Sequence, residues 1–236
     1  MKSEQRLIDF ANETLIGQYL TKKEGDIILS YLNDVKNKLL LDICGGTGRF
    51  ANPLYMEGGD IVVLDIDSIA LSVLHQKNSA ISLVQGDGQK IPFKSSIFDG
   101  ILMIQSVEYI PDINSLIKEC SRILKERGIL LINLSNKNSY KRFRLNRKNY
   151  SFYYKSYGIT YREFKEKLKG TGLIIEKAIG YNWAPVSRMS NCKLIPFFFA
   201  LENHLRLKYL PSISPWVFII ARKSISEKEI YKEWDK

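Results

Sequence analysis

The feature that most constrains this chain is an apolar run that enters a glycine-rich turn at residues 39–48. The run is continuous in Leu and Ile, which is typical of a strand buried on both faces of a parallel sheet. Glycines follow at 45, 46 and 48, and a short helix is predicted over residues 49–57. Such a turn lets backbone N–H groups approach a polar ligand at the sheet edge where α/β proteins bind cofactors. The turn alone does not identify the ligand, because dinucleotide and phosphate sites use it too.

Short apolar runs and helix-like segments alternate along the rest of the chain. This alternation predicts a mostly parallel sheet covered by helices on both faces. The 236 residues are enough for one α/β domain of this type. Ser68 and Thr160 stand where they would cap helices. The predicted strands are residues 38–43, 61–66, 81–85, 98–104, 128–134, 172–179 and 216–221, and the predicted helices are residues 1–35, 49–57, 68–75, 114–124 and 161–169.

Polar residues stand at the ends of the predicted strands beyond the turn. Asp65 ends the second strand about twenty residues after the turn, where a nucleoside-binding α/β fold places the carboxylate that binds the ribose hydroxyls. Asp87 follows the third strand, and Gln105 follows the fourth. Because the carboxyl ends of parallel strands meet at one edge of a sheet, these residues are expected at the same edge.

In order and spacing, these elements resemble the core of the class I S-adenosylmethionine-dependent methyltransferases, of the type 11-like kind. The similar series is Asp-x-x-Gly-Gly-Thr-Gly, a strand-end Asp, Gly-Asp-x-x-x-x-Pro-Phe and Phe-Asp-x-apolar-Gln-Ser, followed by Arg-Ile-Leu-Lys-x-x-Gly at residues 122–128. It covers residues 39–134 with specific motifs and the rest of the chain weakly. The resemblance implies a three-layer, Rossmann-like α/β fold. Its seven-stranded sheet is mostly parallel with the last strand antiparallel, and it carries N-terminal helices and an insertion before the last strand.

The resemblance also implies how the chain is divided. Residues 1–236 would form a single methyltransferase domain, with a helical lid at 1–36 and the cofactor-binding core at 37–134. The acceptor pocket of this class is usually built by the N-terminal helices and by segments around the last strands. Here those segments would be the substrate-side insertions at 135–159 and 183–212.

The same resemblance implies which residues bind S-adenosylmethionine (SAM) and its product S-adenosylhomocysteine. On the methionine side they are Asp42, Cys44, Gly45, Gly46 and, through its backbone, Gln105. On the nucleoside side they are Asp65 for the ribose diol, Ile66 beside the adenine, and Asp87 with Gly88 at the adenine amino group. Asp67 is either a further ligand or a helix cap. Asp99 is expected to orient a strand, and Gly48 to allow close packing between helix and strand.

The chain departs from the family pattern at two places. Cys44 replaces the first glycine of the usual turn, which we interpret as a tolerated change that keeps a negative φ, and not as a catalytic thiol. Glu108-Tyr109 stands where many relatives carry Glu-His, so a histidine base from that position is absent. The candidate general bases are therefore Glu108, Tyr109, Tyr19 and His204.

Most of the net charge of +10 lies within residues 137–169, where eleven Lys or Arg are opposed by two Glu. A cationic face attracts phosphate, nucleic acid or an anionic membrane surface, but an ordinary lysine-rich surface looks the same. The favoured acceptor is a small molecule, with an anionic or phosphorylated one included. A sugar, a glycan precursor or an aromatic, quinone-type metabolite methylated on O or N fits this description. Two alternatives stay open: an RNA methyltransferase that uses the basic face, and a non-catalytic SAM-binding regulatory or partner protein.

Composition narrows the remaining classes. Three Cys and two His argue against a disulfide framework and a metal site. The first thirty residues are too charged for a secretory signal, and no apolar run approaches the roughly 20 residues of a membrane-spanning helix. A cytoplasmic monomer or homodimer is expected. The aromatic stretch at 195–201 either touches a membrane surface or packs over the active site.

Overall fold

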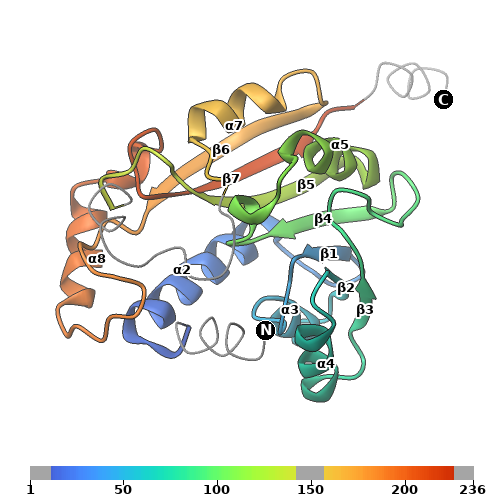
Figure 1. The fold of residues 1–236 in the computed structure, drawn as a ribbon, viewed down its shortest axis with the longest axis horizontal. Coiled ribbons are helices and arrows are strands. Elements are labelled where there is room, and N and C mark those ends of the chain that lie inside the picture. The colour runs from blue at the N-terminus through green and yellow to red at the C-terminus, as the bar shows by residue number, and fades with distance from the viewer. Residues whose placement is uncertain (1–11, 142–156, 226–236) are drawn as a thin grey trace.

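The computed structural model describes residues 12–141 and 157–225. Their strands form one seven-stranded sheet in the order β3-β2-β1-β4-β5-β7-β6 (Figure 1). The predicted strands are all present, with ends that differ by a few residues. They are β1 (Leu39–Ile43), β2 (Asp60–Asp65), β3 (Ser82–Gln85), β4 (Phe98–Met103), β5 (Leu124–Ser135), β6 (Leu173–Tyr181) and β7 (Trp216–Lys223).

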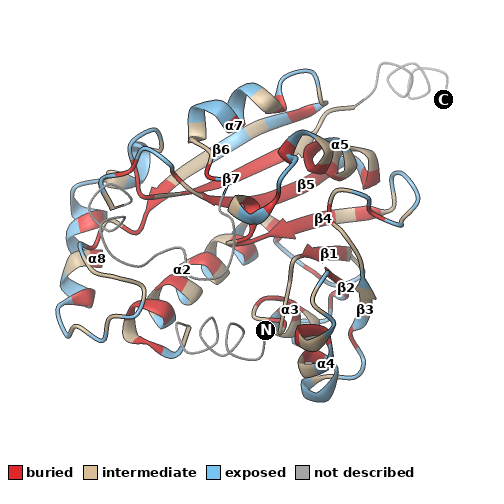
Figure 2. Ribbon diagram, viewed as in Figure 1, coloured by how far each residue is buried: buried red, intermediate tan, exposed pale blue. Residues whose placement is uncertain are grey.

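Helices cover both faces of this sheet, as the alternating pattern predicts. Residues of α2, α3, α4 and α8 belong to one buried cluster, whereas residues of α5 and α7 belong to the other, so the molecule has three layers (Figures 1 and 2). The helices are α2 (Leu15–Leu32), α3 (Ala51–Met56), α4 (Ser68–Lys77), α5 (Ile113–Ile123), α7 (Tyr161–Leu168) and α8 (Ile195–His204), with 3-10 turns η1 (Val107–Tyr109) and η2 (Leu207–Tyr209).

The direction of the strands gathers several chain segments at one edge of the sheet. β1 to β5 run parallel, and β7 lies antiparallel between β5 and β6, which confirms the expected topology. Trp216, the first residue of β7, pairs with Ser135 and Tyr181, the last residues of β5 and β6. The segments that follow β5 and β6 therefore leave the sheet at the same edge as the glycine turn that follows β1.

Helix α2 packs one continuous row of side chains against the sheet. The row has the four-residue spacing of one helix face and consists of Ile16, Leu20, Glu24, Ile28 and Leu32, all buried. Tyr19 of the same helix stacks on Phe199 of α8 with ring centroids 5.3 Å apart. Part of the 195–201 stretch therefore packs on α2, although Phe197 stays 60% exposed. Within the described ranges, no helix combines the length and apolarity that crossing a bilayer requires.

Two local expectations differ from the structure. Asp67 and not Ser68 caps α4, because its carboxylate accepts hydrogen bonds from the N–H groups of Ile69 and Ala70. Strand β5 begins at Leu124, before the turn predicted at Arg127–Gly128. The pairing between β4 and β5 is irregular at this point, and Arg127 has a φ of 60°.

Candidate cofactor site

The turn after β1 is shaped by contacts that only glycine allows. A Cβ on Gly45 would lie 2.8 Å from the Asp42 carboxylate and 2.9 Å from Val63. Gly46 and Gly48 have φ values of 54° and 79°, in the left-handed region that side chains disfavour. At Gly48 a Cβ would also fall 2.4 Å from Leu74 of α4, so this glycine has the predicted role of letting helix and turn pack closely.

Cys44 corrects the expectation of a negative φ at this turn. Its φ is 56°, so a cysteine adopts the left-handed conformation that a glycine would adopt without strain. Its N–H still donates to the Leu64 carbonyl at 2.7 Å, which holds the turn against β2. Burial, followed by the nearby carboxylates of Asp65 and Asp42, raises the pKa of the Cys44 thiol far above its ordinary value. The thiol is therefore no nucleophile, in agreement with the sequence interpretation.

Asp65 links the end of β2 to the glycine turn. One carboxylate oxygen accepts the Gly46 N–H at 2.8 Å, and the other accepts the Asp67 N–H at 2.9 Å. Both oxygens keep lone pairs for further donors such as ribose hydroxyls. Asp67 acts as the cap of α4, which is one of the two roles left open for it.

Asp42 lies under the turn, almost fully buried at 3% exposure. Burial raises the pKa of its carboxyl to about 7, with the Arg49 guanidinium opposing the shift and Asp65 adding to it. A buried carboxyl that titrates near neutrality would be driven to its charged form by an ammonium group placed beside it.

The ends of β2 and β3 offer an apolar surface and a polar edge. Ile66 is 70% exposed, an unusual state for an isoleucine at a strand end and a suitable one for covering a flat ring. Asp87 follows β3, and its carboxylate accepts the backbone N–H of Gln89 at 2.9 Å. Gly88 is buried, and a Cβ there would lie 3.1 Å from Ile43.

Beyond β4, a buried carboxylate from α2 organises the edge. Glu24 is fully buried and accepts hydrogen bonds from the Gln105 amide at 2.9 Å, from the Asn133 amide at 2.9 Å and from the Tyr181 hydroxyl at 2.6 Å. Arg49 adds an ion pair at 3.3 Å. Gln105 itself has φ 61° and donates its backbone N–H to Asn133, which leaves its carbonyl as the backbone group able to meet a ligand donor.

Comparison with known proteins agrees with this geometry. A sequence model described as a methyltransferase domain matches residues 41–132, which contain the turn and the ends of β1 to β4. Over these residues the chain is similar to the class I SAM-dependent methyltransferases. Its seven-stranded sheet and strand order are those of this fold.

Two curated relatives that match part of this chain have names that refer to quinones. The demethylmenaquinone methyltransferase of Bacillus licheniformis is 32% identical over 113 residues, which are 45% of this chain and 49% of that protein. The ubiquinone/menaquinone biosynthesis C-methyltransferase UbiE of Pectobacterium carotovorum is 31% identical over 106 residues, 41% of this chain and 42% of that protein. The chain thus spans about half the length of the curated relatives it matches.

A solved structure of similar fold covers more of the chain. The SAM-dependent methyltransferase of Thermotoga maritima described as a possible histamine N-methyltransferase aligns with a TM-score of 0.66 over 94% of this chain and 97% of that one. Its sequence identity of 16% extends the likeness to the fold alone.

The four candidate bases lie at three separate places in the structure. Glu108 and Tyr109 lie on η1 after β4, where both influence the Arg188 guanidinium. Tyr19 is occupied in the stack between α2 and α8. His204 lies exposed in the last turn of α8. Asp99 accepts the Leu39 N–H at 2.9 Å and pairs with Lys125, so it orients a strand as expected.

Sequence reasoning missed the Glu24 network and one buried amine. The signal for Glu24 was present, because a carboxylate interrupts an apolar row of four-residue spacing on α2. Lys141, in the segment after β5, donates to Asn182 Oδ1 at 2.7 Å, and burial lowers the pKa of its amine to about 7, with Glu202 opposing. An amine with this pKa can accept a proton near neutral pH.

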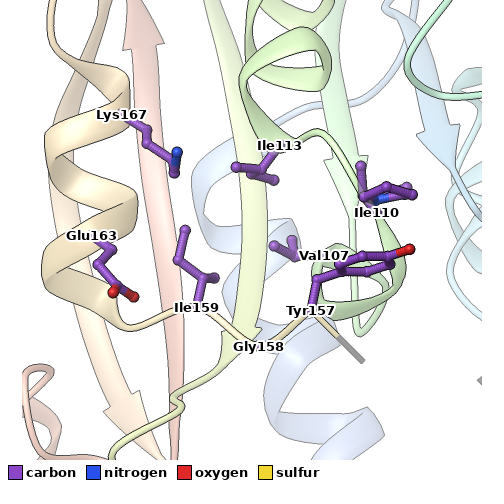
Figure 3. A pocket seen from close by; sticks show the side chains of 9 residues that line it. Val107, Ile110, Ile113, Tyr157, Gly158, Ile159, Glu163 and Lys167 are labelled. Atoms are coloured by element: carbon purple, nitrogen blue, oxygen red, sulfur yellow. The ribbon is translucent and has the colours of Figure 1, made fainter. Parts of the chain in front are cut away.

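A pocket of about 400 Å³ lies between η1, α5 and α7, on the face of the sheet that α5 and α7 cover (Figure 3). Val107, Ile110, Ile113 and Ile159 form the apolar part of its wall, and Glu163 and Lys167 of α7 border it (Figure 3). None of its lining residues belongs to the predicted cofactor set, so it is separate from the glycine turn.

Proposed function

We propose that the protein transfers a methyl group from SAM to a small aromatic acceptor of the quinone type. The observation that carries the proposal is the shared edge formed by the Gly45–Gly46 turn, Asp42 and Asp65. Three residues in chain order suit the three parts of SAM. The buried acid Asp42 suits the methionine amino group, the strand-end acid Asp65 suits the ribose diol, and the exposed Ile66 suits the adenine ring.

The residues at this edge suit each part of the cofactor. Asp42 would hold the methionine amino group together with the Gln105 carbonyl. Asp65 would accept the ribose hydroxyls with the lone pairs that Gly46 and Asp67 leave. Ile66 would cover one face of the adenine, and Asp87 with Gly88 would meet its amino edge. SAM, when bound, supplies a methyl group on a good sulfonium leaving group.

The chain contributes alignment, exclusion of water and, for some acceptors, a base. Glu24 holds the side chains of Gln105 and Arg49 in place. The residues proposed to bind the methionine part of SAM are therefore positioned before the ligand binds. For a hydroxyl or amine acceptor, a base would add roughly 10²–10⁴-fold. Glu108 after β4 and Lys141 after β5 are the groups we propose for this role, because both belong to segments that leave the sheet at the cofactor edge.

Two observations support an aromatic acceptor. The curated relatives named above carry names that refer to quinones, and their similarity covers less than half of this chain. The acceptor side of this chain is aromatic: Tyr181 and Trp216 meet edge to face at 5.7 Å, and Tyr140 stacks on Trp183 at 6.3 Å. Flat rings of this kind suit a flat acceptor.

The basic segment predicted for RNA binding is described in part. Lys167 donates to Asn114, and Lys169 pairs with Glu166 on the surface of α7. Arg142, Arg144, Arg147, Lys148 and Lys155 lie outside the described residues. RNA methylation therefore stays a prediction from sequence, and so does the non-catalytic alternative.

Formation of S-adenosylhomocysteine in the presence of candidate acceptors tests the proposal. The panel contains demethylated quinone precursors, catechols, sugar phosphates and bulk RNA. We expect turnover with a quinone precursor or catechol, and its loss in Asp65→Asn. Turnover confined to RNA, with steep salt dependence, would contradict the acceptor assignment. SAM binding without turnover on any member would favour the non-catalytic alternative.

A further inference from the structure

Two arginines from distant parts of the chain meet at the cofactor edge. Arg49 follows the glycine turn, and Arg188 lies in the segment after β6. Both guanidinium groups donate to one oxygen, Asn12 Oδ1, at 3.4 and 2.7 Å respectively. Paired guanidinium groups converging on one oxygen resemble the arrangement that proteins use for carboxylates and phosphates.

The charges of the two guanidinium groups repel each other. Glu24 pairs with Arg49 at 3.3 Å, but the same carboxylate also accepts hydrogen bonds from three neutral side chains of its network. Burial, and after it the repulsion from Arg49, lowers the pKa of Arg188, while the charges of Glu24 and Glu108 oppose the shift. An anion that binds between the two guanidinium groups would relieve this repulsion.

Aromatic side chains and the backbone hold the arginines in position. The Arg188 guanidinium carbon lies 5.6 Å from the Trp216 ring centroid, and that of Arg49 lies 4.4 Å from the Phe50 ring. A guanidinium group over a ring keeps its N–H edge available for in-plane hydrogen bonds.

The segment that carries Arg188 is fastened to the start of α2. The Thr14 hydroxyl donates to the Arg188 carbonyl at 2.9 Å. Two further bonds join Leu15 to Asn191 at 2.8 Å and Ile16 to Ser190 at 3.3 Å. The position of Arg188 is thus set before any ligand binds, which reduces the entropic cost of binding one.

We propose that Arg49 and Arg188 form an anion-binding site that takes a carboxylate or phosphate group at the cofactor edge. The inference rests on the proposed function, because two ligands of a methyltransferase carry such a group. One is an anionic acceptor, and the other is the methionine end of SAM. Arg188 belongs to the segment between β6 and β7 that is expected to contact the acceptor, whereas Arg49 is near enough to act on the Asp42 carboxyl.

Calorimetric titration with three probes separates these ligands. S-adenosylhomocysteine carries the carboxylate, 5′-methylthioadenosine is the matching nucleoside without the amino-acid part, and pyrophosphate is added to protein saturated with S-adenosylhomocysteine. Arg188→Gln removes the charge, and Arg188→Lys keeps it without the planar fork. Arg162→Gln, on the exposed surface of α7, is the charge-matched control.

The expected result is a loss of roughly tenfold or more in Arg188→Gln for one anionic probe, with 5′-methylthioadenosine binding unchanged and Arg162→Gln like the wild type. A loss for S-adenosylhomocysteine assigns the site to the methionine carboxylate. A loss confined to pyrophosphate assigns it to the acceptor.

The inference is overturned if both folded Arg188 variants bind S-adenosylhomocysteine and pyrophosphate as the wild type does. It is also overturned if the wild type binds no pyrophosphate and binds S-adenosylhomocysteine no more tightly than 5′-methylthioadenosine. If neither nucleoside binds the wild type, the proposed function has failed. Pyrophosphate titrated into the ligand-free protein then still decides whether the arginine pair binds anions.

Discussion

At the scale of single residues, the cofactor edge depends on the left-handed backbone of Cys44 and on the oxygen that Arg49 and Arg188 share. Asp42, Asp65 and the glycines stand in a motif, so their positions were predictable from spacing. The left-handed φ of Cys44 was not, because cysteine normally avoids that region and only the closure of the turn against β2 imposes it. Arg49 and Arg188 were equally hidden, since 139 positions separate them and Asn12 joins them only in the folded chain.

Gly48 offers a direct test of close packing. Gly48→Ala combines a φ of 79° with a Cβ 2.4 Å from Leu74, so we expect it to lower the free energy of unfolding by about 2–4 kcal/mol. Gly170→Ala is the matched control, because Gly170 has φ 75° with open space around it and should lose about 1–2 kcal/mol from backbone strain alone. Urea denaturation measures both. Equal losses would show that Leu74 moves aside without cost.

Asp42 makes stability depend on pH. In the folded protein burial raises the pKa of its carboxyl to about 7, above the ordinary value of 3.8, so the folded state holds a proton that the unfolded chain releases. Its contribution to stability is therefore greatest below the unfolded pKa and falls as pH rises toward 7, by at most about 1.4 kcal/mol per pH unit.

Asp42→Asn should remove that slope. We expect the free energy of unfolding, measured by urea at pH 5, 6, 7 and 8 without ligand, to decline more steeply with pH in the wild type than in Asp42→Asn up to pH 7. All other titrating groups are common to the two proteins, so the difference isolates Asp42. Parallel profiles would contradict a proton on this carboxyl.

At the scale of elements, the start of α2 and the segment after β6 behave as one structural unit. Thr14 caps α2 by accepting the Gly17 N–H at 3.2 Å and also donates to the Arg188 carbonyl. The geometry of the cofactor edge therefore depends on an N-terminal helix and on the connection between β6 and β7.

Two helix caps separate stability from binding. Thr14→Ala and Thr160→Ala each remove a capping hydroxyl and should each cost about 1 kcal/mol of unfolding free energy. Only Thr14 holds the Arg188 segment, whereas Thr160 forms a capping box on α7 with Glu163. We expect SAM affinity to fall in Thr14→Ala and to stay at the wild-type value in Thr160→Ala, as measured by calorimetry. An equal effect of the two variants on affinity would show that the contact to Arg188 is irrelevant.

Elements of the core were predictable because their patterns are local. The parallel strands β1, β2 and β4 consist mostly of apolar residues. Thr160, which caps α7, stands directly before that helix in the sequence. Predictions failed where tertiary contacts decide: Asp67 outcompetes Ser68 as a cap because its carboxylate reaches two N–H groups of α4. Glu24 escaped notice because a charged residue in an apolar row becomes meaningful only when Asn133 and Tyr181 arrive from β5 and β6.

At the scale of the whole molecule, the antiparallel strand β7 places the segment after β6 beside the segment after β5, at the edge of the glycine turn. By pairing with both β5 and β6, it makes the segments after these strands leave the sheet at the edge where β1, β2 and β4 end. Those segments contain Lys141 and Arg188, and α2 contributes Glu24 to the same edge. The proposed methyl transfer needs such an arrangement, because the methyl donor and the acceptor atom must meet in one site from which water is excluded.

The central claim is that this edge binds SAM through the acid at the end of β2. Calorimetric titration of SAM and S-adenosylhomocysteine into the wild type, Asp65→Asn and Asp60→Asn tests it most directly. Asp60 is an exposed acid at the opposite end of the same strand, so it controls for the charge removed from β2. We expect binding in the micromolar range for the wild type and Asp60→Asn, and a loss of at least about tenfold in Asp65→Asn, which gives up a charge-assisted bond to the ribose. A folded wild type that binds neither ligand, or an Asp65→Asn variant that binds both as tightly as the wild type, would contradict the claim.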